Sequence, residues 1–408
     1  MTQIFALGDS KGASSSLQEA SRALEVRLFE GVGGGARRGG SSLAEPDLAG
    51  LLFQGFRLTL LKVLGQSAAL GGSLLPGTVL WQELENKLVA FDYFCHGELA
   101  LGATGQESLE EALAGGAAMD PYLGVWTREG LGHSRAVRAL QENTLPETGD
   151  FLPGDLRPTD LVPLHTGLGL ALAGRFIENV GSGGRKGLEE HLSDFLARCE
   201  MVAQPGYGRT AREALGLMVR QLRPDLLMEV DRLLGRVDPE RQEVFWHGVG
   251  RGLYLSPSHA VSGWGVWRAF EEARTLPPHE VGRLNAVSGL AWALTLVNIT
   301  HPEVVELRWR QQRQHLDGDP ALAAAFLDGV RAALLIWHAA VGYEAYLERF
   351  LTYGPPSIEA AEAWRRCIVQ PCEAALKLAC AGHWEGAAVA ELFRFLPQGT
   401  ALKGRSQL

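Results

Sequence analysis

Hydrogen-bonding residues recur just before a series of glycines, and their types and spacing make them the first candidates for chemistry. All of them can donate or accept hydrogen bonds, although their sequence neighbours are mostly apolar. The residues are Gln54, His96, Thr166, Tyr207, His247, Ser288 and Asp328. A buried polar group is costly unless it is paired. We therefore expect this polar stripe either to pair with neighbouring helix ends or to line a groove in which a ligand pairs with it.

The segment "FWHGVGRGLYL" (245–255) contains the strongest catalytic candidates, His247 and Arg251. Residues four positions apart share one face of a helix, so these two side chains could transfer a proton and anchor a substrate together. Asp328 completes the predicted catalytic set. The polar residues predicted to orient the substrate are His96, Thr166, Tyr207 and Ser288.

Aromatic residues near the same segments predict an apolar wall beside the polar stripe. The predicted substrate-binding aromatic residues are Trp246, Tyr254, Trp292 and Trp337. Such rings suit a long apolar or polyunsaturated ligand, although many aromatic residues simply fill a core. In the ligand-binding interpretation, Trp246 and Trp292 shape the wall and stabilise developing positive charge.

Other common catalytic motifs are absent from the sequence. No histidine pair has the HExxH spacing of a zinc site, and a site built from His96, His165 and His247 is disfavoured. In "GSGGRKG" (181–187), Lys186 is followed by Gly187 rather than Ser or Thr, and no strand is predicted before it. GxSxG, Rossmann and DDxxD signatures are also missing. We therefore predict neither a metal nor a cofactor.

The glycines recur at nearly constant spacing, which indicates how the elements that carry these residues are arranged. From Gly167 through Gly208, Gly248 and Gly289 to Gly329, the steps are 208 − 167 = 41, 248 − 208 = 40, 289 − 248 = 41 and 329 − 289 = 40. Gly55 and Gly97 extend the series with 97 − 55 = 42. The step 167 − 97 = 70 predicts an insertion over about 104–158.

Helical periodicity around these glycines predicts an all-α fold of stacked helical hairpins, either a HEAT-like solenoid or an α/α ring. Glycine within a helix costs about 0.5–1 kcal/mol relative to alanine. Close packing between helices can offset that cost, and small residues follow four positions later at Ala171, Gly252, Ala293 and Ala333. Helix breaks are predicted at Asp238-Pro239, Pro277-Pro278 and Asp319-Pro320.

Composition divides the chain into three predicted parts and limits its function. We expect a flexible segment with one short helix over 1–45, a helical repeat domain over 46–345 and a C-terminal helical cap over 346–408. The 408 residues are 46% hydrophobic and 21% charged, which is typical of a globular protein. The net charge of −9 and the lack of a Lys/Arg-rich block disfavour nucleic acid as a partner.

The sequence also predicts a cytoplasmic protein without a membrane span. No secretory signal pattern is found at the N-terminus. The most apolar stretch, 321–341, contains Asp328 and Arg331, so we interpret it as a buried helix. The five cysteines form no CxxC pair and are typical of free thiols in a reducing compartment; they are Cys95, Cys199, Cys367, Cys372 and Cys380.

The segment "FWHGVGRGLYL", followed by "NAVSGLAWALTLVN", resembles an uncharacterised family of bacterial proteins encoded beside the iterative polyketide synthases of enediyne biosynthesis. Those proteins show a GhGRAL-type segment, a helix break and an SGhGLAAT-type segment. The counterparts here are Gly248, Gly250, Arg251, Leu253, Ser288, Gly289, Leu290, Ala291 and Ala293. "HTGLGLALA" and "QGFRLTL" are similar to the family's earlier glycine segments. The resemblance covers about 50–340; Gly252 departs from the commoner Ala, and 340–408 has no counterpart.

The resemblance implies a role in secondary metabolism on a polyketide-derived, polyene-type intermediate, without supplying catalytic residues. Together with the polar stripe, it suggests that the protein binds such an apolar intermediate in an interior groove and promotes its folding or cyclisation, as a cofactor-free cyclase- or lyase-type enzyme. One alternative is a non-catalytic helical scaffold that docks biosynthetic partner proteins. An unusual terpenoid cyclase is a second alternative, which the missing aspartate-rich motif disfavours.

Overall fold

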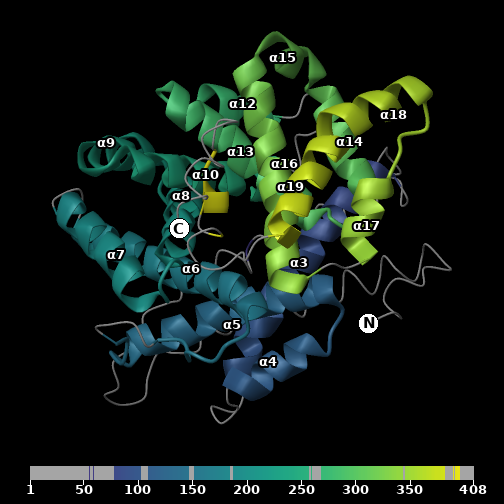
Figure 1. Cartoon of the computed structure of the whole chain (residues 1–408). Coiled ribbons are helices and arrows are strands. Elements are labelled where there is room, and N and C mark those ends of the chain that lie inside the picture. Colours follow the sequence, from purple (N-terminus) through teal and green to yellow (C-terminus); the bar gives the residue numbers. More distant parts are fainter. Residues whose placement is uncertain are drawn as a thin grey trace, which may run out of the picture.

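The computed structural model describes residues 78–102, 109–146, 151–183, 187–256, 268–342, 345–381 and 391–395, with residues 55, 58, 259 and 389. All regular secondary structure in these ranges is helical (Figure 1), which confirms the all-α prediction. The predicted segment 1–45 and Gln54 lie outside the described residues.

Seven long helices in the described ranges form a series, in which each packs mainly against the next; we call them the central helices. They are α3 (Val79–Gly102), α5 (Pro121–Gln141), α6 (Pro158–Gly183), α8 (Gly208–Leu222), α10 (Pro239–Leu255), α13 (Glu280–Val297) and α16 (Pro320–Val341). Contacts join corresponding parts of neighbouring helices. Arg209 and Glu240 pair between the first turns of α8 and α10, so these two helices run parallel.

Shorter helices connect the central ones along the periphery. They are α4 (Leu109–Ala117), α7 (Leu188–Val202), η1 (Pro224–Leu226), α9 (Leu227–Val237), α12 (Arg268–Thr275), α14 (Pro302–Gln311) and α15 (Arg313–Gly318). Asp238 and Asp319 cap α10 and α16 through side-chain hydrogen bonds to the backbone, and a proline follows each cap. Two predicted helix breaks therefore mark the starts of central helices.

Glycines allow the central helices to approach at backbone distance. A Cβ atom on Gly248 would overlap the carbonyl oxygen of Glu213, and one on Gly289 would overlap that of His247. Gly329 makes the same contact with the carbonyl of Ser288. This close approach places His247, Ser288 and Asp328 of the polar stripe next to interfaces between central helices.

The spacing of these contacts is less regular than the sequence indicates. Helix α5 lies within the segment predicted as an insertion, yet it packs between α3 and α6, and its Gly132 contacts the Leu164 carbonyl. In α8 the backbone contact is made by Gly216 against Phe245, whereas Gly208 begins the helix beside the Glu200 side chain. The regular stack of forty-residue hairpins therefore stays a prediction.

The series of central helices curls back on itself. Helix α16 contacts α6 and α5, and α3 contacts α13 and α14. Between α3 and α13, the Asn86 side chain donates to Asn298 at 2.9 Å, and Arg308 of α14 pairs with Glu83 of α3 at 2.6 Å. Helices from the two ends of the described chain therefore share one core.

The chain after α16 forms α17 (Ala345–Thr352), α18 (Ile358–Trp364), the π-helix η2 (Arg365–Val369), α19 (Gln370–Ala381) and the short 3₁₀ helix η3 (Glu391–Phe393). Helix α19 lies along α16 (Figure 1). By contrast, η3 contacts α8 and α10 as well as α16. Part of the region predicted as a C-terminal cap thus returns to the central helices.

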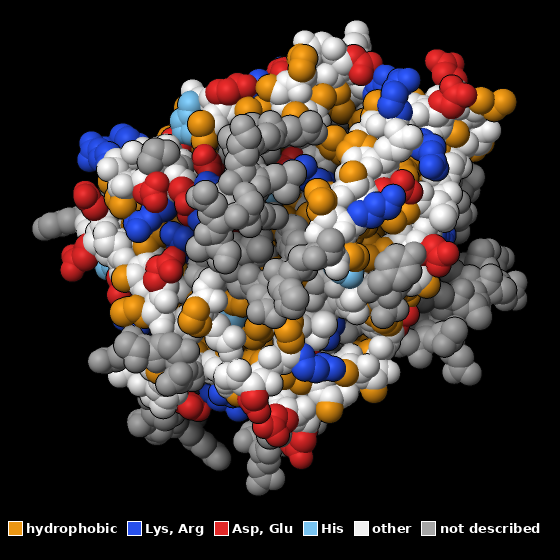
Figure 2. Space-filling view, viewed as in Figure 1, with side chains coloured by type: hydrophobic (Ala, Val, Ile, Leu, Met, Phe, Trp, Pro, Cys, Tyr) orange, Lys and Arg blue, Asp and Glu red, His pale blue; other side chains and the backbone are white. Residues whose placement is uncertain are grey.

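By length and composition, α16 is the one described helix that could cross a membrane. Of its most apolar window, 67% is buried inside the protein, which fits the interpretation of a core helix. On the face shown in Figure 2, acidic and basic side chains are interspersed rather than gathered by sign.

Candidate functional site

Helix α10 places His247 and Arg251 on one buried face, because they are four residues apart. His247 is fully buried and Arg251 is 3% exposed. The guanidinium of Arg251 donates to Glu213 of α8 at 3.1 Å and also to Glu129 of α5. We call Glu129, Glu213, His247 and Arg251 the buried ionic centre; it joins helices from both halves of the series.

The ionic centre is stable in the interior because its charges are paired. An isolated charge in a protein interior costs several kcal/mol, and the side chains of Glu129 and Glu213 are 6% and 0% exposed. Arg251 lies between them, and the two carboxylates raise its pKa although burial alone would lower it. Arg251 is therefore held by protein partners rather than left available for an anionic ligand.

The two carboxyl groups have their pKa values shifted in opposite directions. Burial raises the pKa of Glu129, and the charge of Arg251 only partly opposes this. Burial would also raise the pKa of Glu213, but the charge of Arg251 and a hydrogen bond from His247 lower it overall. When two carboxyl groups have pKa values shifted in opposite directions, one can act as the acid and the other as the base in proton transfer.

His247 is oriented for proton transfer. Its Nδ1 lies 3.3 Å from Glu213 Oε1, so Nδ1 donates when it carries the proton and Nε2 is then an acceptor. His247 Nε2 is buried and has no hydrogen-bond partner among the described residues. A histidine that is held by a carboxylate and keeps one nitrogen unpaired has the arrangement of a general base.

Aromatic rings flank His247, and the neighbouring helix α13 carries further unpaired polar atoms. Its ring lies edge-to-face with Trp292 at 5.7 Å and with Phe393 at 6.2 Å. Ser288 and Trp292 share one face of α13, and Ser288 Oγ and Trp292 Nε1 are buried without partners in the described part of the chain. Since unpaired buried polar atoms are unfavourable, these atoms are candidates for hydrogen bonds to the polar groups of a ligand.

The structure brings only part of the predicted polar stripe to this centre. Thr166 donates to the Val162 carbonyl of its own helix, and Tyr207 precedes α8 and stacks on His165 at 4.7 Å. Asp328 pairs with Arg331 on α16, and His96 is exposed. Because the central helices do not repeat at constant spacing, these residues do not all reach the same environment.

The predicted aromatic wall is divided in the same way. Trp246 donates to Asp231 at 2.7 Å, on the side of α10 that packs near His279. The hydroxyl of Tyr254 accepts from Asn298 at 2.7 Å. Trp337 packs against Tyr122 and Tyr346 in the core. Of the four predicted aromatic residues, Trp292 lies at the ionic centre, where the Arg251 guanidinium is 5.5 Å from its ring centre.

Three residues of the site were not predicted from the sequence: Glu129, Glu213 and Phe393. Glu213 carries a usable signal, since a carboxylate stands on the apolar face of α8 beside Ala214. Glu129 lies in the predicted insertion, so its role depends on the placement of α5.

No protein family, curated protein or solved structure matches this chain significantly. The described residues also contain no group of three or more His, Cys, Asp or Glu side chains placed to hold a metal ion. What the geometry defines is an all-α protein with a buried ionic centre.

Proposed function

We propose that this protein binds a largely apolar molecule beside the buried ionic centre and transfers a proton on it, which promotes folding or cyclisation of a polyketide- or polyene-type intermediate. The observation that carries the proposal is His247, which is buried beside Trp292, held at Nδ1 by Glu213 and unpaired at Nε2.

The chemistry needs no cofactor. His247 Nε2 accepts a proton from a carbon next to a substrate carbonyl, and the electron pair left on that carbon forms the new carbon–carbon bond. The proton on His247 then passes to the oxygen of the acceptor carbonyl. Glu213 stabilises the imidazolium, and Arg251 positions Glu213. Exclusion of water strengthens these electrostatic interactions.

The substrate class rests on two supports of different kinds. The rings of Trp292 and Phe393, with centroids 5.8 Å apart, form an apolar environment beside His247. The resemblance of the α10 and α13 segments to the enediyne-associated family supports a polyketide-derived chain and a role in bacterial secondary metabolism. A cytoplasmic location and contact with biosynthetic partner proteins belong to the same proposal.

Gene replacement in the native producer tests the function. Some metabolite of the producer should require this protein for its formation. We expect His247→Gln to lower the yield of that metabolite by about 100-fold or more, the usual scale for loss of a general base. The readout is mass spectrometry of apolar extracts, with circular dichroism as a check that the variant folds. His191→Gln on α7 is the matched control. Unchanged product with a folded His247→Gln protein would reject the proposal.

A further inference from the structure

The C-terminal residues 391–395 lie over the candidate site; we call them the C-terminal plug. Phe393 is fully buried, with its ring 6.2 Å from His247 and 5.8 Å from Trp292. The plug is the 3₁₀ helix η3 with Arg394 and Phe395, and it contacts α8, α10 and α16. One phenyl ring from a short segment therefore occupies the space next to the proposed base.

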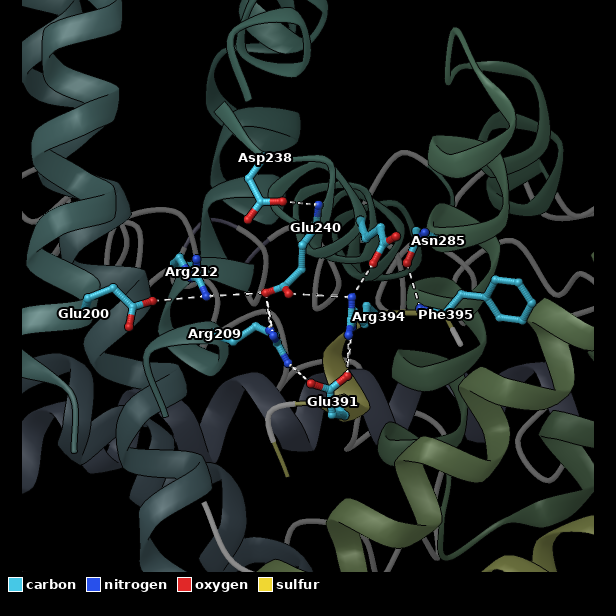
Figure 3. Close-up of polar contacts among 10 residues, drawn as sticks. Glu200, Arg209, Arg212, Asp238, Glu240, Asn285, Glu391, Arg394 and Phe395 are labelled. Carbon is cyan, nitrogen blue, oxygen red and sulfur yellow. Dashed lines mark hydrogen bonds and ion pairs between the residues drawn. The ribbon is translucent and has the colours of Figure 1, made fainter. Parts of the chain in front are cut away.

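Ion pairs around its edge hold the plug (Figure 3). Glu391 pairs with Arg209 of α8, while Arg394 pairs with Glu243 of α10 at 2.8 Å. The Phe395 backbone N–H donates to Asn285 at 2.7 Å. The four charged side chains are 15–25% exposed, so solvent reaches them and salt weakens the pairs.

We propose that Phe393 occupies the ring-binding subsite of the candidate site and that ligand entry requires displacement of the C-terminal plug. The ligand then carries a phenyl-sized, rigid unsaturated ring with a hydrogen-bonding group such as a hydroxyl or carbonyl. This inference rests on the proposed function, which identifies His247 and its surroundings as the binding site. It adds the chemical class of the ligand and the way in which the ligand reaches the site.

The two halves of this inference follow from different observations. The ring size follows from Phe393 itself, which fills the position against His247 and Trp292. The polar group follows from the unpaired ring nitrogens of His247 and Trp292, which a hydrocarbon would leave unsatisfied. Displacement follows from the way the plug is held, since a short segment with one deeply buried ring opens more readily than the central helices.

Phe393→Ala in the full-length chain tests the subsite, with phenol and toluene as probes. Phe326→Ala is the matched control, because Phe326 is equally buried and packs near Phe270 in the core. We expect the ratio of phenol to toluene affinity to be about tenfold higher in Phe393→Ala than in Phe326→Ala, the effect of one hydrogen bond. Equal ratios, or no binding to a folded Phe393→Ala protein, would overturn the subsite.

Hydrogen exchange tests displacement without removing the ring. In the wild-type protein we expect the Phe395 amide to exchange at least about tenfold faster than the amides of α10 and α13, and faster again in about 0.5 M salt. Arg394→Gln should accelerate it by about tenfold. Arg198→Gln, which breaks an exposed pair with Asp194 on α7, should not. Exchange of the plug at the rate of the central helices, unchanged in Arg394→Gln, would overturn the proposal.

The two sets of experiments separate the inference from the proposed function. If phenol binds Phe393→Ala and the plug opens while His247→Gln leaves the metabolite unchanged, the subsite stands and proton transfer is rejected. If His247→Gln abolishes the metabolite while the plug opens only on global unfolding, the function stands and the displaceable plug is rejected.

Discussion

Individual buried side chains should make the stability of this protein sensitive to pH. His165 of α6 is fully buried, its Nδ1 lies 2.6 Å from the Leu161 carbonyl, and its Nε2 accepts from the Gln204 amide at 3.0 Å. A donor on one ring nitrogen and an acceptor on the other require the neutral ring. Burial lowers the pKa of His165 from 6.5 to about 4, despite the hydrogen bond to Leu161.

His165 should therefore destabilise the fold in mild acid. Its folded pKa lies below its unfolded value, so its stabilising contribution is complete above about pH 6.5 and is lost as the pH falls towards about 4. The full loss is about 3 kcal/mol. Urea unfolding at pH 7, 5.5 and 4.5 measures it. His165→Gln should show a shallower fall than the wild type, and parallel curves would contradict the assignment.

Lys87 of α3 is predicted to oppose folding at neutral pH. Its ammonium lies 4.0 Å from the Tyr254 ring centre and 3.6 Å from Glu83, which also pairs with Arg308. Burial lowers its pKa to about 8, although Glu83 acts in the opposite direction. The folded pKa is below the unfolded value of 10.5, so stability should rise between about pH 8 and 10.5.

Lys87→Met should remove that rise and increase stability at pH 7 by about 1–3 kcal/mol, because Glu83 keeps its pair with Arg308. Urea unfolding at pH 7, 9 and 10.5 measures both effects. Lys377→Met, at an exposed position of α19, provides the control. A large loss of stability in Lys87→Met at pH 7 would show that the ammonium supports the fold.

Among individual residues of the candidate site, the sequence predicted those that lie on the same helix. It missed residues that are distant in sequence and come together only in the folded chain. His247 and Arg251 were found together because they are four positions apart, and Trp292 and Ser288 have the same relation on α13. Glu129 lies 122 residues from Arg251, and no local pattern connects such distant positions. Phe393 was missed for the same reason, since the return of the chain to the centre has no signal in the sequence around it.

Among the helices, the sequence predicted the start of a central helix best where a capping residue precedes a segment that contains one of the repeated glycines. Asp238-Pro239 and Asp319-Pro320 fixed the starts of α10 and α16. Helix α5 lies within the segment predicted as an insertion, because the step from Gly97 to Gly167 is 167 − 97 = 70 residues rather than about forty. Packing between two helices depends on where their backbones can touch. The loops that connect the helices can change in length without moving that contact, so the glycine spacing need not stay constant.

The glycine contacts give a direct prediction about helix packing. A Cβ on Gly289 would overlap the His247 carbonyl, whereas one on Gly115 of α4 would meet nothing within 4 Å. Gly289→Ala must push α10 and α13 apart, which should cost about 3 kcal/mol. Gly115→Ala should stabilise α4 by about 0.5–1 kcal/mol. Thermal and urea unfolding measure both, and similar effects of the two substitutions would contradict the role assigned to close helix contact.

At the scale of the whole molecule, contacts between distant central helices should make unfolding cooperative. The Tyr122 hydroxyl of α5 donates to the Val297 carbonyl of α13 at 2.7 Å, and Arg251 of α10 reaches Glu129 of α5. In an open solenoid each unit contacts only its neighbours, so a local change weakens one region. Here the two halves of the series share buried polar contacts and should therefore lose stability together.

Tyr122→Phe tests that cooperativity. The substitution leaves the buried Val297 carbonyl without this donor, which should cost about 1–3 kcal/mol. Native-state hydrogen exchange should show an equal loss of protection in α5 and α13, because the contact joins these two distant members of the series. Tyr353→Phe, at a half-buried position after α17, should leave both helices unchanged. Loss of protection in α5 and its immediate neighbours alone would indicate that the helices behave as an open array despite their contacts.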